Sequence, residues 1–274
     1  MRISSLRIAL WLALAGLGCS KSVASRSEPS SRPASSVVPS VAVAPPPDPV
    51  VTSAVDAHGL HVESGTIQRA SVWGFSDITV DLKWTELEVE RAPRGALLNK
   101  LLTEKMLAVI NGGYFEADFK PSGWLKSQGE EFSPKADTSK GGVFAVRKTG
   151  VYVGPFSGLT FEPELAIQSH PLIVEAEGAS GIHRDDGRRA ARTVVCVSEG
   201  RLRFILIAAP RGDGPTLFES AALLRAPAPQ GFGCSRALNL DGGPSSGVVF
   251  GPGVPAKSRL PVAPVAYAIA IHPR

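Results

Sequence analysis

Short apolar segments, each about the length of one strand, dominate residues 51–274 of this chain. Residues 78–84 and 87–90 alternate polar and apolar side chains, which is typical of strands with one buried face. Residues 142–153 predict a hairpin whose turn lies at Thr149-Gly150. Further strands are expected at residues 106–110, 172–174, 193–197, 202–208 and 265–271. A chain with so many short strands builds its core from sheets.

Two segments have the residue spacing of helices. Thr216 and Glu219 form a capping box, and Leu217, Ala221 and Leu224 then fall on one face. The leucines at positions 97, 98, 101 and 102 predict a second helix over residues 95–105. The predicted fold class is therefore α+β, with a mixed, mainly antiparallel β-sheet core and a few helices.

The first eighteen residues are typical of an export signal. Arg2 and Arg7 precede the apolar segment 8–15, which is too short to span a bilayer. The following Gly16-Leu17-Gly18-Cys19 resembles a bacterial lipobox, although Gly16 stands where leucine is usual. We therefore predict a signal peptide at residues 1–18 and a lipid on Cys19, or a secreted protein if Cys19 is not lipidated.

Residues 19–50 are rich in serine and proline and include the run Pro45-Pro46-Pro47-Asp48-Pro49. Such a segment buries too little apolar surface to offset the entropy lost on ordering. We expect it to be a disordered tether between the lipidated N-terminus and a domain over residues 51–274. The expected location is the bacterial cell envelope, where the lipid anchors the protein to the membrane on its periplasmic or outer-membrane face.

Two cysteines remain when Cys19 is set aside. Cys196 lies in the predicted strand 193–197, and Cys234 lies shortly before the apolar pair Ala237-Leu238. In an oxidising compartment the two are able to form a disulfide that holds these elements side by side. Two buried thiols are the alternative, and the sequence leaves both open.

Two glycine-rich turns carry the polar side chains most typical of a binding site. Asn239-Leu240-Asp241-Gly242-Gly243-Pro244-Ser245-Ser246 follows Ala237-Leu238, and Asn111-Gly112-Gly113-Tyr114-Phe115 follows the predicted strand 106–110. Glycine has no Cβ, so backbone N–H groups in such turns are able to approach a ligand closely. Each turn alone is also a common hairpin signal. The functional hypothesis therefore requires that both turns converge on one pocket.

Arg192-Thr193, at the start of a predicted strand, is the third candidate segment. A guanidinium at a strand start can point into a cleft, where its two N–H groups match a phosphate or carboxylate. The whole chain has a formal net charge of +4 and no long basic run with interleaved aromatic residues. This composition argues against nucleic acid as a partner.

These segments together resemble the phosphodiester glycosidase domain family. The matching landmarks occur in the family's order and cover about residues 60–272: Asn111 to Phe115, His170-Pro171-Leu172-Ile173-Val174, Arg192-Thr193, Gly214-Pro215-Thr216-Leu217, and Ala237 to Ser246. One departure is Pro244, where many members have a third glycine, and proline removes a backbone N–H donor from the turn.

The resemblance implies hydrolysis of the bond between the anomeric carbon of a sugar and a phosphate. Because a phosphate monoester leaves readily as an anion, stabilisation of its charge by Arg192 matters more than a strong general acid. Asp241 is the expected carboxylate, as a base for water or as a stabiliser of an oxocarbenium-like centre. Asn111 is expected to hold a sugar hydroxyl or the phosphate, and Glu116 is the preferred second carboxylate. The remaining substrate-binding candidates are Gly112, Gly113, Thr193, Asn239, Gly242, Gly243, Ser245 and Ser246.

No cofactor is expected, because the sequence has no His/Cys/Asp cluster with the usual metal spacing, although calcium near Asp241 stays open. The expected partner is a sugar-phosphate or glycan substrate, and the expected state is a monomer. Two alternatives also stay open. One is a non-catalytic glycan-binding envelope lipoprotein of the same fold, and the other is a structural envelope protein in which the two turns are only hairpins and lie far apart.

Overall fold

The computed structural model describes residues 49–69, 71–137, 141–148, 150–210 and 213–274. The predicted signal peptide, the lipidation at Cys19 and nearly all of the predicted tether lie outside these residues. The first described strand begins at Val50, one residue before the predicted start of the domain. No helix within the described residues is long and apolar enough to cross a membrane.

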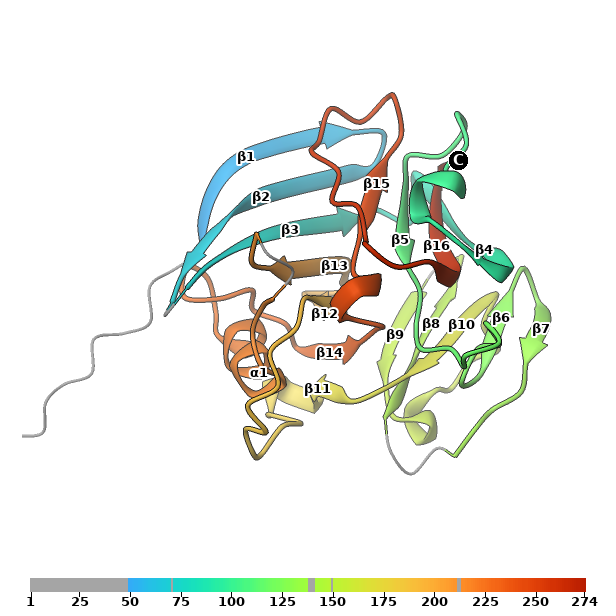
Figure 1. Cartoon of the computed structure of the whole chain (residues 1–274). Coiled ribbons are helices and arrows are strands. Elements are labelled where there is room, and N and C mark those ends of the chain that lie inside the picture. The colour runs from blue at the N-terminus through green and yellow to red at the C-terminus, as the bar shows by residue number, and fades with distance from the viewer. Residues whose placement is uncertain (1–48, 70, 138–140, 149, 211–212) are drawn as a thin grey trace, which may run out of the picture. The chain divides into compact units, whose positions relative to one another are not determined.

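The described residues form three sheets (Figure 1). The first has seven strands in the order β1 (Val50–Ala57), β2 (Leu60–Gln68), β3 (Val72–Val80), β13 (Arg201–Ala208), β12 (Arg192–Ser198), β14 (Arg236–Asn239) and β11 (Leu172–Val174). The second has five strands in the order β7 (Glu130–Ser133), β6 (Leu125–Ser127), β10 (Leu165–Ser169), β8 (Gly142–Arg147) and β9 (Gly150–Gly154). The third has four strands in the order β15 (Val248–Phe250), β5 (Ala108–Asn111), β16 (Val265–Pro273) and β4 (Thr85–Ala96).

The fold class differs from the α+β prediction, because the described domain is mainly β. Every strand pairing within the described residues is antiparallel. The one described α-helix, α1 (Leu217–Arg225), begins at the predicted capping box. The hydroxyl of Thr216 accepts from the Glu219 N–H at 3.1 Å, and the Glu219 carboxylate accepts from the Thr216 N–H at 2.9 Å.

The predicted second helix over residues 95–105 is wrong. This segment holds only the short 3-10 turn η1 (Leu98–Lys100). Leu98 is fully buried on the outer face of the third sheet, where it packs with Val109 and Ala268. Leu101 and Leu102 are partly buried against the same cluster, whereas Leu97 is exposed. A loop that buries leucines against a sheet face has the same apolar content as a helix, so the leucine spacing alone was misleading. The other 3-10 turns are η2 (Phe156–Gly158), η3 (Ala176–Gly178) and η4 (Gly243–Ser245).

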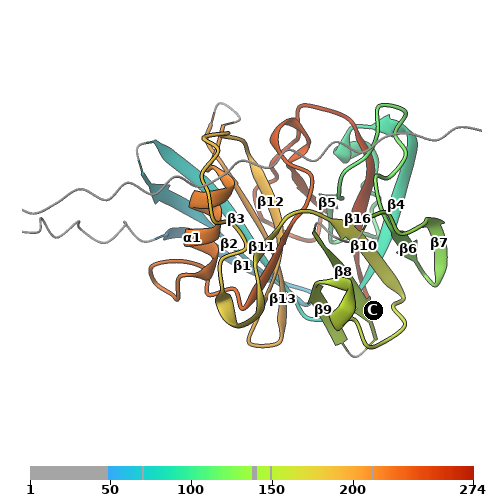
Figure 2. The same ribbon diagram turned by 90° about the horizontal axis from the view of Figure 1, so that it is seen from below.

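Apart from its exposed edge strand β1, the seven-stranded sheet is covered on both faces, and Figure 2 shows it on one side with the other two sheets opposite. Alternation along β12 explains this burial. Val195 belongs to the central core between the sheets, whereas Val194 and Cys196 face a second core that includes Leu223 of α1. The sequence of a strand buried on both faces is a nearly continuous apolar run, and residues 193–197 are such a run.

A disulfide joins Cys196 in β12 to Cys234, which lies between α1 and β14. Both residues are buried in the core beneath α1. Because β14 pairs directly with β12, the disulfide ties the segment entering β14 to the neighbouring strand. The paired form is therefore the one present in the structure, out of the two that the sequence left open.

Candidate active site

The two glycine-rich turns lie against each other, although 130 residues separate them. The Asn111 Nδ2 donates to the Asp241 carbonyl at 2.8 Å, and the Asp241 N–H donates to the Gly112 carbonyl at 3.1 Å. Antiparallel pairing places the end of β14 beside the start of β12, and the end of β5 meets them there. The structure therefore brings the segments that carry Asn111, Arg192 and Asp241 together, which is the convergence of the turns that the functional hypothesis requires.

Arg192 and Asp241 stand opposite each other across the β12–β14 pairing. Leu240 N–H donates to the Thr193 carbonyl at 2.9 Å, and Gly243 N–H donates to the Ala191 carbonyl at 2.7 Å. The first bond continues the register in which Val194 pairs with Asn239, and this register places Arg192 opposite Asp241. The second bond is offset from that register by one residue, so the pairing becomes irregular just beyond Arg192 and Asp241. No described hydrogen bond or ion pair joins the two side chains, and the group on which both charges act is Tyr114.

Backbone carbonyl groups hold the guanidinium of Arg192 through its Nε and one Nη, and the other Nη is not used by any described residue. Its Nε donates to the Pro215 carbonyl at 3.1 Å, and one Nη donates to the Arg188 carbonyl at 2.9 Å. The side chain is largely buried, and this burial lowers the pKa of Arg192 from its usual value. Within the described part of the chain, the other Nη has no acceptor. Arg192 is thus a positioned cation with donors available for an anion.

Asp241 is partly buried just beyond the end of β14. Burial raises the pKa of its carboxyl group, and hydrogen bonds from the Ser245 side chain and the Gly242 N–H partly oppose this increase. The bond from Gly242 N–H to Oδ1 is 2.8 Å long. A carboxylate whose pKa is raised accepts a proton more readily than a solvated aspartate, which suits a base.

Tyr114 is a site residue to which the sequence analysis assigned no role. Its hydroxyl accepts from the Asn239 Nδ2 at 2.6 Å, and its ring stacks on that of His170 at 4.4 Å between centroids. Burial raises the pKa of Tyr114 to about 12; the Asp241 charge adds to this increase, while the Arg192 charge opposes it. Tyr114 therefore lies within the electrostatic reach of both groups and keeps its proton. Its position in the Asn-Gly-Gly-Tyr-Phe run was the available sequence signal.

Asn111 does not have the role that the sequence analysis expected. Its Nδ2 donates to the carbonyls of Gly112 and Asp241, and its Oδ1 accepts from Thr193 Oγ1 at 2.7 Å and Gly247 N–H at 3.0 Å. A side-chain amide has two donor hydrogens and two acceptor lone pairs, so its capacity is used. Asn111 is also fully buried. It positions the two turns and cannot hold a sugar hydroxyl or phosphate.

Two other predicted ligands, Thr193 and Asn239, also form internal bonds, although one acceptor of Asn239 is left without a partner among the described residues. The Oγ1 of Thr193 is fully buried, and it lies 3.1 Å from Ser246 Oγ besides its bond to Asn111. Asn239 is fully buried as well, and its Nδ2 contacts the carbonyls of Leu240 and His170 in addition to the Tyr114 hydroxyl. Its Oδ1 is buried without a hydrogen-bond partner among the described residues.

The glycines serve a different purpose from the predicted one. The N–H groups of Gly112 and Gly113 donate to the carbonyl and the hydroxyl of Tyr267. A Cβ on Gly112 would lie 2.2 Å from the Tyr267 ring. In the second turn, the N–H groups of Gly242, Gly243, Ser245 and Ser246 all donate within the protein. The turns therefore offer no backbone anion cradle, and glycine at 112 is required by close packing against Tyr267.

Glu116 lies in a separate exposed turn. Its N–H donates to the Lys120 carbonyl at 2.8 Å, and its carbonyl accepts from Phe119 N–H at 2.9 Å. Among the described contacts, none joins its side chain to Asp241 or Arg192. The acid whose charge acts on Arg192 is instead Asp186, in the loop before β12. The side chain of Glu116, the preferred second carboxylate, is therefore exposed, although its backbone lies close to the first turn in the sequence.

A group of possible metal ligands occurs away from this site. Ligand atoms of Glu88, Glu90 and His272 lie within 4.8 Å of one another on β4 and β16. His272 follows Ile271, which pairs with Ala108, whereas the candidate site lies at the opposite end of β5 beside Asn111. The group therefore has no part in the arrangement around Asp241.

Comparison with known proteins identifies the class to which this fold and site belong. The family model described as phosphodiester glycosidase matches residues 104–272, which contain the candidate site residues described above. The chain belongs to the phosphodiester glycosidase family. No curated protein was found to match it.

Solved structures share the fold at low sequence identity. The chain is similar to the catalytic domain of zebrafish N-acetylglucosamine-1-phosphodiester alpha-N-acetylglucosaminidase, auto-inhibited by its pro-peptide, with a TM-score of 0.60, 19% identity, and coverage of 83% of this chain and 89% of that one. A hypothetical protein from Synechocystis has a TM-score of 0.56 and 17% identity over 79% of this chain and 62% of that chain, which is less than two thirds of its length. A putative exported protein from Burkholderia pseudomallei K96243 has a TM-score of 0.53 and 12% identity over 74% of each chain.

Proposed function

We propose that this protein is a hydrolase that cleaves glycosyl 1-phosphodiester bonds in envelope or extracellular glycans. The observation that carries the proposal is the opposition of a positioned cation, Arg192, and a carboxylate with a raised pKa, Asp241, with Tyr114 in the field of both. Membership of the phosphodiester glycosidase family supports the reaction class. Export, with a lipid anchor on Cys19, is proposed from the N-terminal sequence.

Three side chains have separate roles in the proposed reaction: Arg192, Asp241 and Tyr114. The free Nη of Arg192 binds the phosphate and stabilises the charge that develops as it leaves. Water adds to the anomeric carbon, the bond from that carbon to the phosphate oxygen breaks with its electron pair leaving on the phosphate, and Asp241 takes the proton from water. Tyr114, which is protonated at neutral pH, donates a hydrogen bond to the substrate. Asn111 and Thr193 hold the framework.

The test is hydrolysis of a panel of sugar 1-phosphodiesters by the purified full chain in ¹⁸O-labelled water. Cleavage at the anomeric carbon places the label in the sugar, whereas attack at phosphorus places it in the phosphate. Asp241→Asn and Arg192→Lys are expected to lower kcat/KM by about 100-fold or more. Label found only in the phosphate, or full activity in both variants, would contradict the assignment.

Matched controls are available in the loop before β12. Asp185 is exposed and also accepts a glycine N–H, from Gly187 at 3.0 Å, so Asp185→Asn repeats the chemistry of Asp241→Asn outside the site. Arg188 is exposed, and its contact with Arg192 uses only its backbone carbonyl, so Arg188→Lys matches Arg192→Lys. Both control variants are expected to keep wild-type kcat/KM.

A non-catalytic glycan-binding function is the second candidate. It is favoured by the exposed position of Glu116 and by the internal use of the turn N–H groups, which leave Arg192 to bind the anion without backbone support. Tight binding of a sugar 1-phosphodiester without release of any product by the wild-type chain would favour this candidate over the hydrolase.

A further inference from the structure

Two adjoining cavities lie at the far end of β12 from the candidate active site. The first, of about 600 Å³, and the second, of about 830 Å³, share Leu82, Lys148 and Arg274 in their linings. They are enclosed by the β3–β4 turn, the β8–β9 hairpin and the β12–β13 turn. The seven residues of β12 separate these cavities from Arg192 by roughly 20 Å.

The second cavity is strongly cationic. Its lining includes Lys83, Lys148, Arg201 and Arg274 but only one acid, Asp81. The Asp81 carboxylate already accepts the Lys83 N–H at 2.9 Å. Within the described part of the chain, Lys148, Arg201 and Arg274 form no ion pair. A concave surface with several unpaired cations concentrates an anionic ligand.

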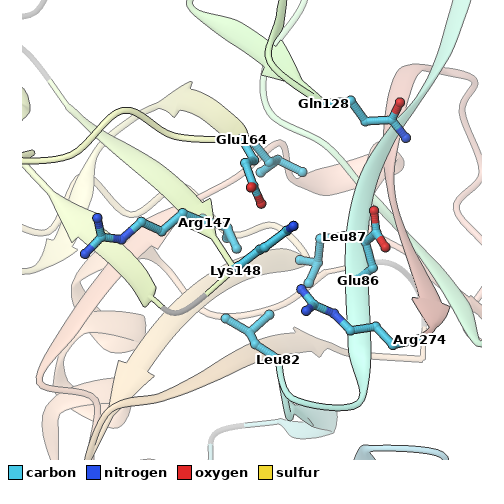
Figure 3. A pocket seen from close by; sticks show the side chains of 10 residues that line it. Leu82, Glu86, Leu87, Gln128, Arg147, Lys148, Glu164 and Arg274 are labelled. Atoms are coloured by element: carbon cyan, nitrogen blue, oxygen red, sulfur yellow. The ribbon is translucent and has the colours of Figure 1, made fainter.

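Figure 3 shows the first cavity and the orientation of its charged side chains. The ammonium of Lys148 and the guanidinium of Arg274 point into the space, together with the carboxylate of Glu164. Glu86 lines the same cavity, so the first cavity carries both signs of charge and only the second is predominantly cationic. Arg147 points away, because its guanidinium lies over the Phe161 ring at 4.6 Å. Arg274 is held in place by Nε, which donates to the Thr85 carbonyl at 2.8 Å, so its Nη groups remain available.

An exposed aromatic ring adjoins the cations. Trp84 is 56% exposed, and its carbonyl accepts the Arg274 N–H at 2.9 Å. Lys83 places its ammonium over the ring at 4.8 Å. An exposed tryptophan offers an apolar face and an N–H group, a combination suited to stacking on a sugar ring. A ring able to stack on a sugar, Trp84, therefore lies next to a cation able to bind a phosphate, Lys83.

We propose that the second, cationic cavity binds phosphate groups of an anionic glycan, as a second site about 20 Å from Arg192. That this ligand is the polymer cleaved at the active site rests on the proposed function. The claim that the site binds phosphate groups does not. A linear polyanion fits better than a membrane surface, because the cations line a hollow at the meeting of three turns. The site holds a long substrate while one of its phosphodiester bonds occupies the active site.

The first test measures binding of inorganic tripolyphosphate to the full chain by calorimetry, in the Asp241→Asn background so that hydrolysis plays no part. The double variant Lys148→Gln/Arg201→Gln is expected to weaken binding at least tenfold, and Lys148→Arg/Arg201→Lys to restore it. Lys100→Gln/Arg94→Gln is the control, because it removes the same charge from exposed positions outside both cavities. Equal affinity in the cavity and control variants would overturn the proposal.

Two further measurements distinguish this second site from the proposed catalytic function and from a membrane contact. The Lys148→Gln/Arg201→Gln variant is expected to keep wild-type kcat/KM on a small sugar 1-phosphodiester while KM for a polymeric glycan phosphate rises several-fold. If small substrates are not cleaved but tripolyphosphate still binds in the cavity, the proposed function fails and this site stands. If tripolyphosphate does not bind, and the same substitutions abolish binding to phosphatidylglycerol vesicles, the surface is a membrane contact and the proposal is wrong.

Discussion

Arg192 and Asp241 occupy opposed positions on neighbouring strands, one at the start of β12 and the other just past the end of β14. The bond from Leu240 N–H to the Thr193 carbonyl continues the register of the two strands up to this pair, so the relationship does not depend on the two side chains themselves. If the pairing of β12 with β14 shifted by one residue, the Arg192 side chain would face the central core and the Thr193 side chain would take the position of Arg192 opposite Asp241. The disulfide from Cys196, four residues along β12, ties the segment before β14 to the same strand.

Removing the hydroxyl of Tyr114 is expected to lower activity without unfolding the protein. In Tyr114→Phe the ring still stacks on His170, and Asn239 keeps its two carbonyl acceptors. We expect kcat to fall by about 100-fold, as for loss of a proton or hydrogen-bond donor, with stability changed by about 1 kcal/mol. Tyr152→Phe is the control, because that hydroxyl bonds to Pro155 in the β9 region. Unchanged kcat and KM in Tyr114→Phe would remove Tyr114 from the site.

The raised pKa of Asp241 predicts opposite pH effects on activity and stability. Activity requires the ionised carboxylate, so kcat/KM should fall as pH drops through a pKa above the usual aspartate value. The folded state, however, holds the proton more tightly than the unfolded state. The Asp241 contribution to stability is therefore greatest below the unfolded pKa and declines as pH rises through the folded pKa.

This linkage makes Asp241→Asn more stable than the wild type at pH 7, with the difference vanishing below about pH 4, where aspartate is protonated in both states. The measurement is the urea midpoint at several pH values, with Asp185→Asn as the exposed control. A variant less stable than the wild type at pH 7 would show that its bonds to Gly242 and Ser245 outweigh the cost of burying the charge.

Asn111→Ala is expected to destabilise the fold, because Asn111 positions the turns and does not contact substrate. The change leaves the Asp241 carbonyl and the Gly247 N–H without a buried partner, at a cost of about 3 kcal/mol in the free energy of unfolding. Urea unfolding measures this loss, and Asn99→Ala, at an exposed position in η1, is the control. A variant with wild-type stability and only a raised KM would restore the substrate-binding role.

Loss of the Cys196–Cys234 disulfide should reduce stability and leave the local site geometry intact. The bond closes a loop with a sequence separation of 38 residues, so the chain-entropy estimate is about 4 kcal/mol. We expect the Cys196→Ala/Cys234→Ala variant to unfold at lower urea concentration than the oxidised wild type and to be indifferent to reducing agent. If reducing agent shifts neither protein, the disulfide contributes little to stability.

Local signals in the sequence predicted much of the fold correctly. The helix α1 begins where the capping box of Thr216 and Glu219 places it, because both bonds of that motif join residues only three positions apart. The strands over residues 193–197 and 202–208 were found because an apolar run of strand length needs no distant partner to be recognised. The leucines at positions 98, 101 and 102 misled for the same reason, because they are buried against the third sheet and nothing local distinguishes this burial from that of a helix face.

The sequence by itself determined the family, the order of the landmark segments and the residue types available for chemistry, because these depend on which residues occur and in what order. Only the tertiary structure decided which of them face a ligand. Asn111, Thr193 and the turn N–H groups are consumed by bonds to partners 52 to 154 residues away or within their own turns, whereas Tyr114 is placed where the charges of Asp241 and Arg192 both act on it. Each polar group can form only a few hydrogen bonds, and contacts between distant segments decide whether any of these hydrogen bonds remain available for a substrate.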